Sequence, residues 1–207
     1  MKIIGFVGMP GSGKSVASNV ARNVGLEVVV MGDVIRAKAS RLGLPPTDEN
    51  LGNVGNMLRA REGPEIVAKR TLELARSSGK DLVVVDGLRS KEEVEFFREN
   101  SDDFRLVEVC ASAESRINRI ANRGRSDDAN SEDADSGDEP EQCSKVVLSS
   151  EDRLQKTAGA LAKRECRELG WGMCEAFNEA DLRIDNDGDL DEFMAKVEAF
   201  LREIEKQ

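Results

Sequence analysis

The sequence contains no histidine, only four cysteines and a single tryptophan in 207 residues. The absence of histidine excludes the catalytic pairs in which an imidazole activates a serine or a cysteine. The cysteines show no C-x-x-C spacing, so we expect no zinc site and predict reduced thiols. Phosphoryl transfer is compatible with this composition, because it depends on positioning and charge stabilisation rather than on an imidazole.

The sequence also lacks a hydrophobic run long enough to span a bilayer. Its first residues already have the pattern of a strand, so we expect no signal peptide, no membrane association and a cytoplasmic protein. The formal net charge is −10. This charge argues against a general nucleic-acid partner, because such binding needs a basic face.

The acidity is concentrated in one segment. Eight acidic residues and no basic residue lie between Ser126 and Gln142. The segment at about 127–142 is polar and low in complexity, which predicts a disordered insertion. Its negative charge would repel nucleotide phosphates, so we do not expect it to contact them.

A glycine-rich segment near the N-terminus fits the phosphate-binding pattern G-x-x-x-x-G-K-[ST]. It consists of Gly8, Met9, Pro10, Gly11, Ser12, Gly13, Lys14 and Ser15. The glycines allow the backbone to turn its N–H groups toward an anion, Lys14 would reach the β- and γ-phosphates of ATP, and the Ser15 hydroxyl would bind Mg²⁺. A strand pattern before it and a helix pattern after it favour this P-loop over a plain glycine-rich turn.

Apolar segments alternate with helical patterns and predict five strands, at residues 2–7, 27–31, 82–86, 104–111 and 180–185. The fold class is therefore α/β, with a parallel five-stranded sheet and helices on both faces. Asp86 ends the third strand in a Walker-B-like pattern and would face the Mg²⁺, although Asp86-Gly87 is also a common turn pair. Because ligands bind at the carboxyl ends of parallel strands, we expect the P-loop, Asp33 and Asp86 to converge there.

Four short motifs carry a resemblance to known kinases. Gly-Asp-Val-Ile-Arg at 32–36, Asp-Gly-Leu-Arg at 86–89 and Arg-Ile-Ala-Asn-Arg at 119–123 resemble elements of adenylate kinases. The segment 180–188 resembles the last strand and adenine-side loop of dephospho-CoA kinases. Apart from the acidic segment, nearly the whole chain is similar to an archaeal ATP-binding family that is related to adenylate kinases and resembles dephospho-CoA kinases.

The resemblance implies a P-loop NTPase of the nucleoside-monophosphate-kinase type, with a single kinase-like domain over residues 1–207. A block of helices longer than a simple crossover needs, at about 44–77, is expected to form a substrate flap. The acidic segment 127–142 would occupy the lid region. The implied reaction is phosphoryl transfer from Mg-ATP to a nucleotide-like or small phosphorylated acceptor.

The resemblance also assigns roles to arginines. Arg36 and Arg89 would clamp the phosphate of the acceptor, since a guanidinium fork binds phosphate in a bidentate manner. Arg123 would contact donor phosphates, and Arg167 would close from the lid-side helix onto the transferring group. Arg116 shares a helix face with Arg123, but we expect it on a solvated basic surface.

The resemblance implies that Asp33 and Asp86 order the Mg²⁺ and its waters, and Asp33 is the candidate general base. For Arg36 and Arg89, the alternative is a surface salt bridge. For the whole protein, the competing hypothesis is a nucleotide-switched ATPase or binding module without an acceptor, which needs no phosphate clamp. A P-loop protein that remodels nucleic acid is disfavoured by the negative charge.

Overall fold

The computed structural model describes residues 1–123 and 150–206. Their strands form one five-stranded sheet in the order β2-β3-β1-β4-β5, and every neighbouring pair is parallel. The strands are β1 (Lys2–Val7), β2 (Glu27–Val30), β3 (Leu82–Leu88), β4 (Asp103–Cys110) and β5 (Leu182–Asp185). The predicted α/β class with a parallel five-stranded sheet is confirmed. The acidic segment predicted at 127–142 lies outside the described residues.

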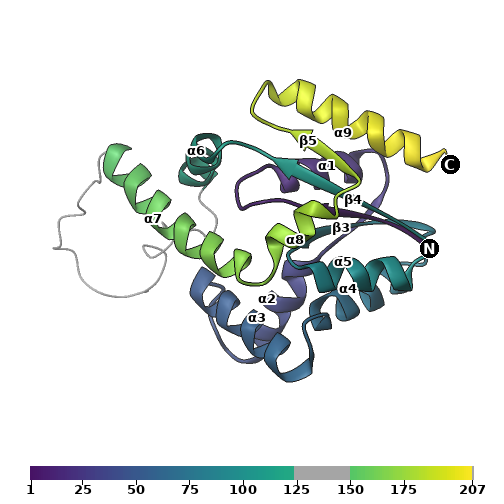
Figure 1. Cartoon of the computed structure of the whole chain (residues 1–207), viewed down its shortest axis with the longest axis horizontal. Helices are drawn as coiled ribbons and strands as arrows, with labels where there is room; N and C mark the ends of the chain where they lie inside the picture. Colours follow the sequence, from purple (N-terminus) through teal and green to yellow (C-terminus); the bar gives the residue numbers. More distant parts are fainter. Residues whose placement is uncertain (124–149, 207) are drawn as a thin grey trace, which may run out of the picture.

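Helices cover both faces of the sheet (Figure 1). On one face, α1 (Lys14–Asn23) packs beside α9 (Leu190–Glu205). The opposite face is covered by α4 (Ile66–Ser77), α5 (Lys91–Asn100) and α8 (Met173–Asn178). The other described helices are α2 (Met31–Arg41), α3 (Asp48–Glu62), α6 (Ala113–Arg123) and α7 (Ser150–Leu169).

Two hydrophobic clusters, one on each face, hold these layers together. In β1, Ile3 packs into the cluster under α4 and α5, whereas Ile4 and Phe6 pack into the cluster under α1 and α9. In the neighbouring strand β3, Val85 packs into the cluster under α4 and α5, and Val84 packs into the cluster under α1 and α9. Both valines are fully buried. Strands covered on both faces need apolar side chains at successive positions, and this explains the uninterrupted valine run in β3.

The local sequence explains where helices near the site begin. Thr47 caps α3, because its side chain accepts a hydrogen bond from the Asn50 N–H at 3.2 Å. Ser90 caps α5 in the same way through the Glu93 N–H, also at 3.2 Å. The segment 44–77, expected from the sequence to be a block of helices, contains α3 and α4. The carboxyl end of β2 leads directly into α2, so Asp33 lies in the first turn of that helix.

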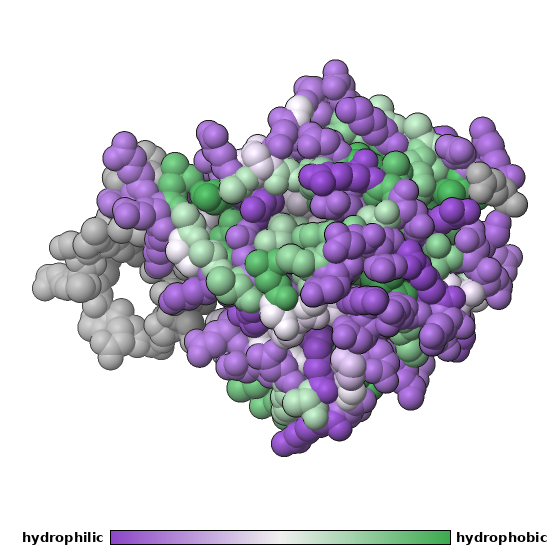
Figure 2. Space-filling model, in the orientation of Figure 1, coloured by the Kyte–Doolittle hydropathy of each residue, from purple (hydrophilic) through white to green (hydrophobic). Residues whose placement is uncertain are grey.

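Hydrophilic residues cover most of the surface in the orientation of Figure 2, and hydrophobic residues gather only in small separate groups. The described part of this face therefore offers no broad apolar patch. Among the helices of residues 1–123 and 150–206, none is long and apolar enough to cross a membrane.

Candidate active site

The P-loop connects β1 to α1 at the carboxyl edge of the sheet. Gly11 and Gly13 have positive φ angles of 82° and 114°, which side-chain-bearing residues rarely adopt. Lys14 is the first residue of α1, and its ammonium group donates hydrogen bonds to the carbonyl oxygens of Gly8 and Met9, the latter at 3.1 Å. The lysine thus lies folded over the loop.

Side chains from two distant segments hold the P-loop backbone. The Asn186 Nδ2 group donates to the Ser12 carbonyl at 2.7 Å, and Asn186 is only 2% exposed. Arg119 donates to the carbonyls of Ser12, at 3.4 Å, and Asn186. Arg116 pairs with Glu165 and is 8% exposed, so our expectation of a solvated Arg116 was wrong. The loop conformation therefore depends on α6 and on the segment after β5.

Replacing Asn186 by alanine is expected to cost about 1–3 kcal/mol of stability and to weaken nucleotide binding, because the Ser12 carbonyl loses a buried donor. Urea unfolding and titration with a fluorescent ATP analogue measure the two effects. Asn23→Ala, at the exposed end of α1, is the control. An Asn186→Ala protein as stable as this control would show that the contact does not support the loop.

The two predicted metal ligands line the same cavity. Ser15 and Asp86 both face a space of about 380 Å³ beside the P-loop. Asp86 is 7% exposed, and one of its oxygens accepts a hydrogen bond from Ser18 Oγ at 2.8 Å. A hydroxyl and a carboxylate oxygen suit Mg²⁺, which usually takes few protein ligands together with waters and substrate phosphates. Within the described residues, no group of three or more acidic, cysteine or histidine side chains could hold a metal alone.

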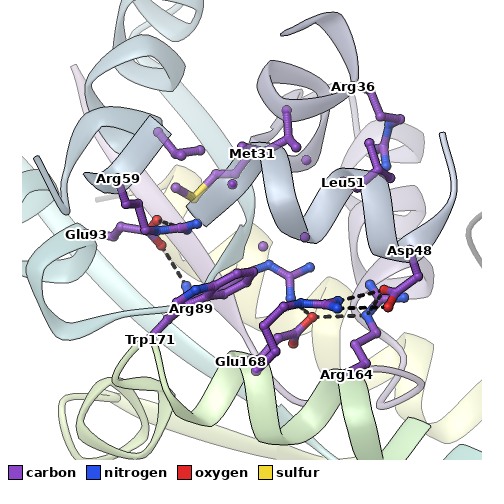
Figure 3. A pocket seen from close by; sticks show the side chains of 17 residues that line it. Met31, Arg36, Asp48, Leu51, Arg59, Arg89, Glu93, Arg164, Glu168 and Trp171 are labelled. Carbon is purple, nitrogen blue, oxygen red and sulfur yellow. Dashed lines mark hydrogen bonds and ion pairs between the residues drawn. The ribbon is translucent and has the colours of Figure 1, made fainter. Parts of the chain in front are cut away.

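A second cavity, of about 70 Å³, lies between α2, α3 and the C-terminal end of α7 (Figure 3). We call it the inner cavity, and the space beside the P-loop the outer cavity. Six residues line both, namely Gly32, Arg36, Gly87, Arg89, Arg164 and Glu168. The two cavities are therefore neighbours that share one wall.

Charged side chains surround the inner cavity. Its lining includes five arginines and three carboxylates, namely Arg36, Arg59, Arg89, Arg164, Arg167, Asp48, Glu93 and Glu168. Arg59 pairs with buried Glu93 at 2.7 Å, and Arg167 makes two hydrogen bonds to Asp48, at 2.8 and 3.0 Å. The excess of guanidinium groups over carboxylates favours an anionic ligand.

Arg89 occupies the wall between the cavities. Its side chain forms an ion pair with Glu168, and its backbone N–H donates to a Glu93 oxygen at 2.8 Å. Burial, followed by the nearby charge of Arg164, lowers the pKa of Arg89 to about 9, although Glu93 acts in the opposite direction. The group is still a cation at neutral pH, and a bound anion would relieve the repulsion among these arginines.

Trp171, in the turn between α7 and α8, also lines the inner cavity (Figure 3). The Arg59 guanidinium lies 4.4 Å from its ring centroid, a cation–π distance. Its indole N–H donates to Asn56 Oδ1 on α3 at 2.7 Å. Sequence reasoning missed this contact, because one tryptophan in a turn forms no recognisable motif.

The residues predicted to bind the acceptor or to act in catalysis lie at different places relative to the two cavities. Arg36 and Arg89 line both cavities, whereas Arg167 lines the inner one. Asp33 is exposed and pairs with Arg36 at 2.7 Å, and it is absent from the described lining of both cavities. The side chain of Arg123 lies outside the described part of the chain.

Sequence reasoning also missed Arg164. It lies one helical turn before Glu168 on α7, and its Nε donates to Glu168 at 3.0 Å. It lines both cavities, which places a further guanidinium between them. The signal that could have found it is the i, i+4 spacing of Arg164 and Glu168.

The sheet order, the P-loop and the adjoining cavities define a P-loop NTPase with a kinase-like fold. Two solved structures share this fold: TT1252 from Thermus thermophilus and a gluconokinase from Sinorhizobium meliloti 1021. Their TM-scores are 0.52 and 0.50, and their sequence identities are 20% and 16%. The alignments cover 97% and 98% of this chain, and 96% and 93% of the two structures.

The sequence comparisons identify the family. A profile described as an AAA domain matches residues 7–135. A UPF0200 protein of Methanothrix thermoacetophila is 50% identical over 99% of this chain and 98% of its own length. Another, from Halobacterium salinarum, is 39% identical over 97% of this chain and 93% of its own length. The chain belongs to the archaeal UPF0200 family.

Proposed function

We propose that the protein is a Mg-ATP-dependent phosphotransferase that acts on a nucleotide-like or small phosphorylated acceptor, as in adenylate kinases or dephospho-CoA kinases. One observation carries this proposal: a cavity beside the P-loop shares a wall with a cavity rich in arginines. Such neighbouring spaces suit a nucleotide donor and an anionic acceptor that meet at the common wall. A protein that only binds ATP has no need of the second space.

The P-loop side would bind the donor. Lys14 lies close enough to the loop to turn toward the β- and γ-phosphates, and Ser15 and Asp86 would hold Mg²⁺. Bound Mg²⁺ would neutralise negative charge on the phosphates. Arg119 and Asn186 keep the loop in position, and Arg123 would add a further contact to donor phosphates.

The inner cavity would bind the acceptor. Arg36 and Arg89 would clamp its anionic group, while Arg167 would close from α7 onto the same molecule. Asp33 would order Mg²⁺ and its waters, which requires Arg36 to release it. The ion pairs within the cavity would exchange for contacts with the ligand, so little new charge has to be desolvated.

Production of ADP and of phosphorylated acceptor tests the proposal directly. The full chain with Mg-ATP is incubated with AMP, CMP, GMP, UMP or dephospho-CoA, at low and at molar salt. Stimulation of ADP release by one acceptor, with a phosphorylated product, is the expected result. Slow ADP release that no acceptor changes would instead favour the nucleotide-switched ATPase.

Replacing Gly52 by alanine is expected to weaken acceptor binding several-fold while ATP binding is retained. A Cβ atom at this position of α3 would lie 2.8 Å from the Arg167 guanidinium, so the arginine would have to move. Misplacement of a substrate-positioning group by a fraction of an ångström suffices for such an effect. The KM for the acceptor measures it.

The matched control is Gly159→Ala on α7, where an added Cβ meets no atom within 4 Å. This variant should keep the KM and gain up to about 1 kcal/mol of stability from helix propensity. An unchanged KM in both variants would remove Arg167 from the acceptor site.

A further inference from the structure

The carboxylates of the inner cavity differ in how their oxygens are used. Both Asp48 oxygens accept hydrogen bonds from Arg167. Both Glu93 oxygens are used as well, since one accepts from Arg59 and the other from the Arg89 N–H. Glu168 alone keeps one oxygen, Oε2, buried and without a partner among the described residues.

The position of Glu168 is as unusual as its hydrogen bonding. Its side chain is 2% exposed, and it is the one carboxylate in the described lining that borders both cavities. It lies in the last turn of α7, where the helix dipole disfavours a negative charge. Arg89 and Arg164 offset this cost by pairing with its Oε1 (Figure 3).

An unpartnered carboxylate oxygen can only accept a hydrogen bond. A buried acceptor left unsatisfied is unfavourable, and a ligand that supplies a hydrogen-bond donor removes this cost. A phosphate monoester near neutral pH presents mainly acceptor oxygens, so it cannot supply the missing donor and would be repelled by the carboxylate. A hydroxyl group supplies both a proton donor and a nucleophilic oxygen.

We propose that the protein phosphorylates a hydroxyl group of its acceptor, with Glu168 as the catalytic residue that accepts the hydroxyl proton. This inference rests on the phosphotransferase function proposed above and distinguishes hydroxyl acceptors from phosphate acceptors. The arginines of the inner cavity, Arg59 and Arg167 among them, bind an anionic group elsewhere on the same molecule. The substrate class is therefore a small anion, or a nucleotide, that carries a free hydroxyl.

The proposed step balances without a further reactant. The hydroxyl oxygen forms a bond to the γ-phosphorus of ATP while the bond from that phosphorus to the β–γ bridging oxygen breaks. ADP leaves with the bridging oxygen, and the proton passes to Oε2 of Glu168. Arg164, which lines both cavities, stabilises the negative charge of the phosphoryl group during its transfer.

The linkage in the product tests the reaction class with the unaltered protein. The full chain and Mg-ATP are offered AMP, dephospho-CoA and glycerol 3-phosphate, and the products are examined by phosphorus NMR and by hydrolysis in hot dilute acid. A new phosphate monoester, which resists acid, is expected. An acid-labile anhydride on the acceptor would overturn the inference while the phosphotransferase function stands. With AMP as the acceptor, that product is ADP, and isotopically labelled AMP distinguishes it from the ADP that ATP releases.

The variant Glu168→Gln tests the residue. It is expected to lower turnover by about 10²-fold or more, because the amide cannot accept the proton. Acceptor affinity should change only a few-fold, as followed by the fluorescence of the sole tryptophan, Trp171. A residue that merely neutralised Arg89 would affect affinity and stability rather than turnover. Glu168→Asp keeps the carboxylate and should retain more activity than Glu168→Gln.

The remaining outcomes decide whether Glu168 takes part in the chemistry and whether phosphoryl transfer occurs at all. Equal turnover of wild type and Glu168→Gln would remove Glu168 from the chemistry. If the glutamine variant fails to bind ATP, the Glu168→Asp variant and the product linkage decide. ATP hydrolysis with no phosphorylated acceptor would overturn the phosphotransferase function, and this inference with it.

Discussion

Replacing Lys14 by alanine should lower phosphoryl transfer by about 10²–10³-fold or more, with a marked loss of ATP affinity. The ammonium group lies against the carbonyl oxygens of Gly8 and Met9, within reach of any phosphate held by the loop. Removal of one such positioned cation or donor typically costs this much in rate, because little water is present to replace it. Transfer rates with saturating acceptor and titration with a fluorescent ATP analogue measure both effects.

The control for this variant is Lys91→Ala. Lys91 is half exposed on α5 and pairs with Glu95 one turn later, so its loss should change stability by less than about 1 kcal/mol and leave transfer unchanged. A Lys14→Ala protein that transferred phosphate as fast as Lys91→Ala would show that the donor does not bind at the P-loop.

Replacing Arg89 by alanine should abolish transfer while ATP binding persists, and it should destabilise the protein by about 3 kcal/mol. The side chain borders both cavities and pairs with Glu168, which is almost fully buried. Truncation removes the proposed clamp and leaves Arg164 as the partner of the carboxylate among the residues that the structure describes. Loss of one partner of a buried ion pair commonly costs about 3–5 kcal/mol, and the remaining arginine should keep the effect near the lower end.

Urea unfolding and acceptor-dependent ADP release separate the two consequences. Arg89→Lys keeps a cation and should recover stability more than activity, because an ammonium group lacks the bidentate geometry. Arg202→Ala on α9, where the arginine is half exposed and pairs with Glu198, is the surface control. If Arg89→Ala retained full acceptor-dependent transfer, the arginine would be structural and would not belong to an acceptor clamp.

The parallel sheet, and the meeting of the P-loop and Asp86 at its edge, could be predicted from the sequence, because both depend on contiguous patterns. The strand-to-helix context of the P-loop is local, and Asp86 follows a valine run that only a doubly covered strand requires. The carboxyl ends of parallel strands meet at one edge of the sheet, so these segments come together independently of the loop conformations.

The inner cavity was not predictable in the same way. Asp48 and Arg167 are 119 residues apart, and neither belongs to a periodic pattern that would indicate their pairing. Glu168 resembles any acidic residue of an exposed helix until Arg89 is placed against it. Arg116 was misjudged for the same reason, because helical spacing identifies a shared face but not the element that covers it.

The hydrogen bond from Asn186 to the Ser12 carbonyl has a consequence for folding during biosynthesis. The two residues are 174 positions apart. The P-loop is synthesised early, but this hydrogen bond can form only after almost the entire chain has been synthesised. Domains fold largely as units during translation, with N-terminal parts available first. A ribosome-bound chain that ends before β5 should therefore expose an incomplete phosphate loop, and nucleotide capture should begin only when the last strand has emerged and docked.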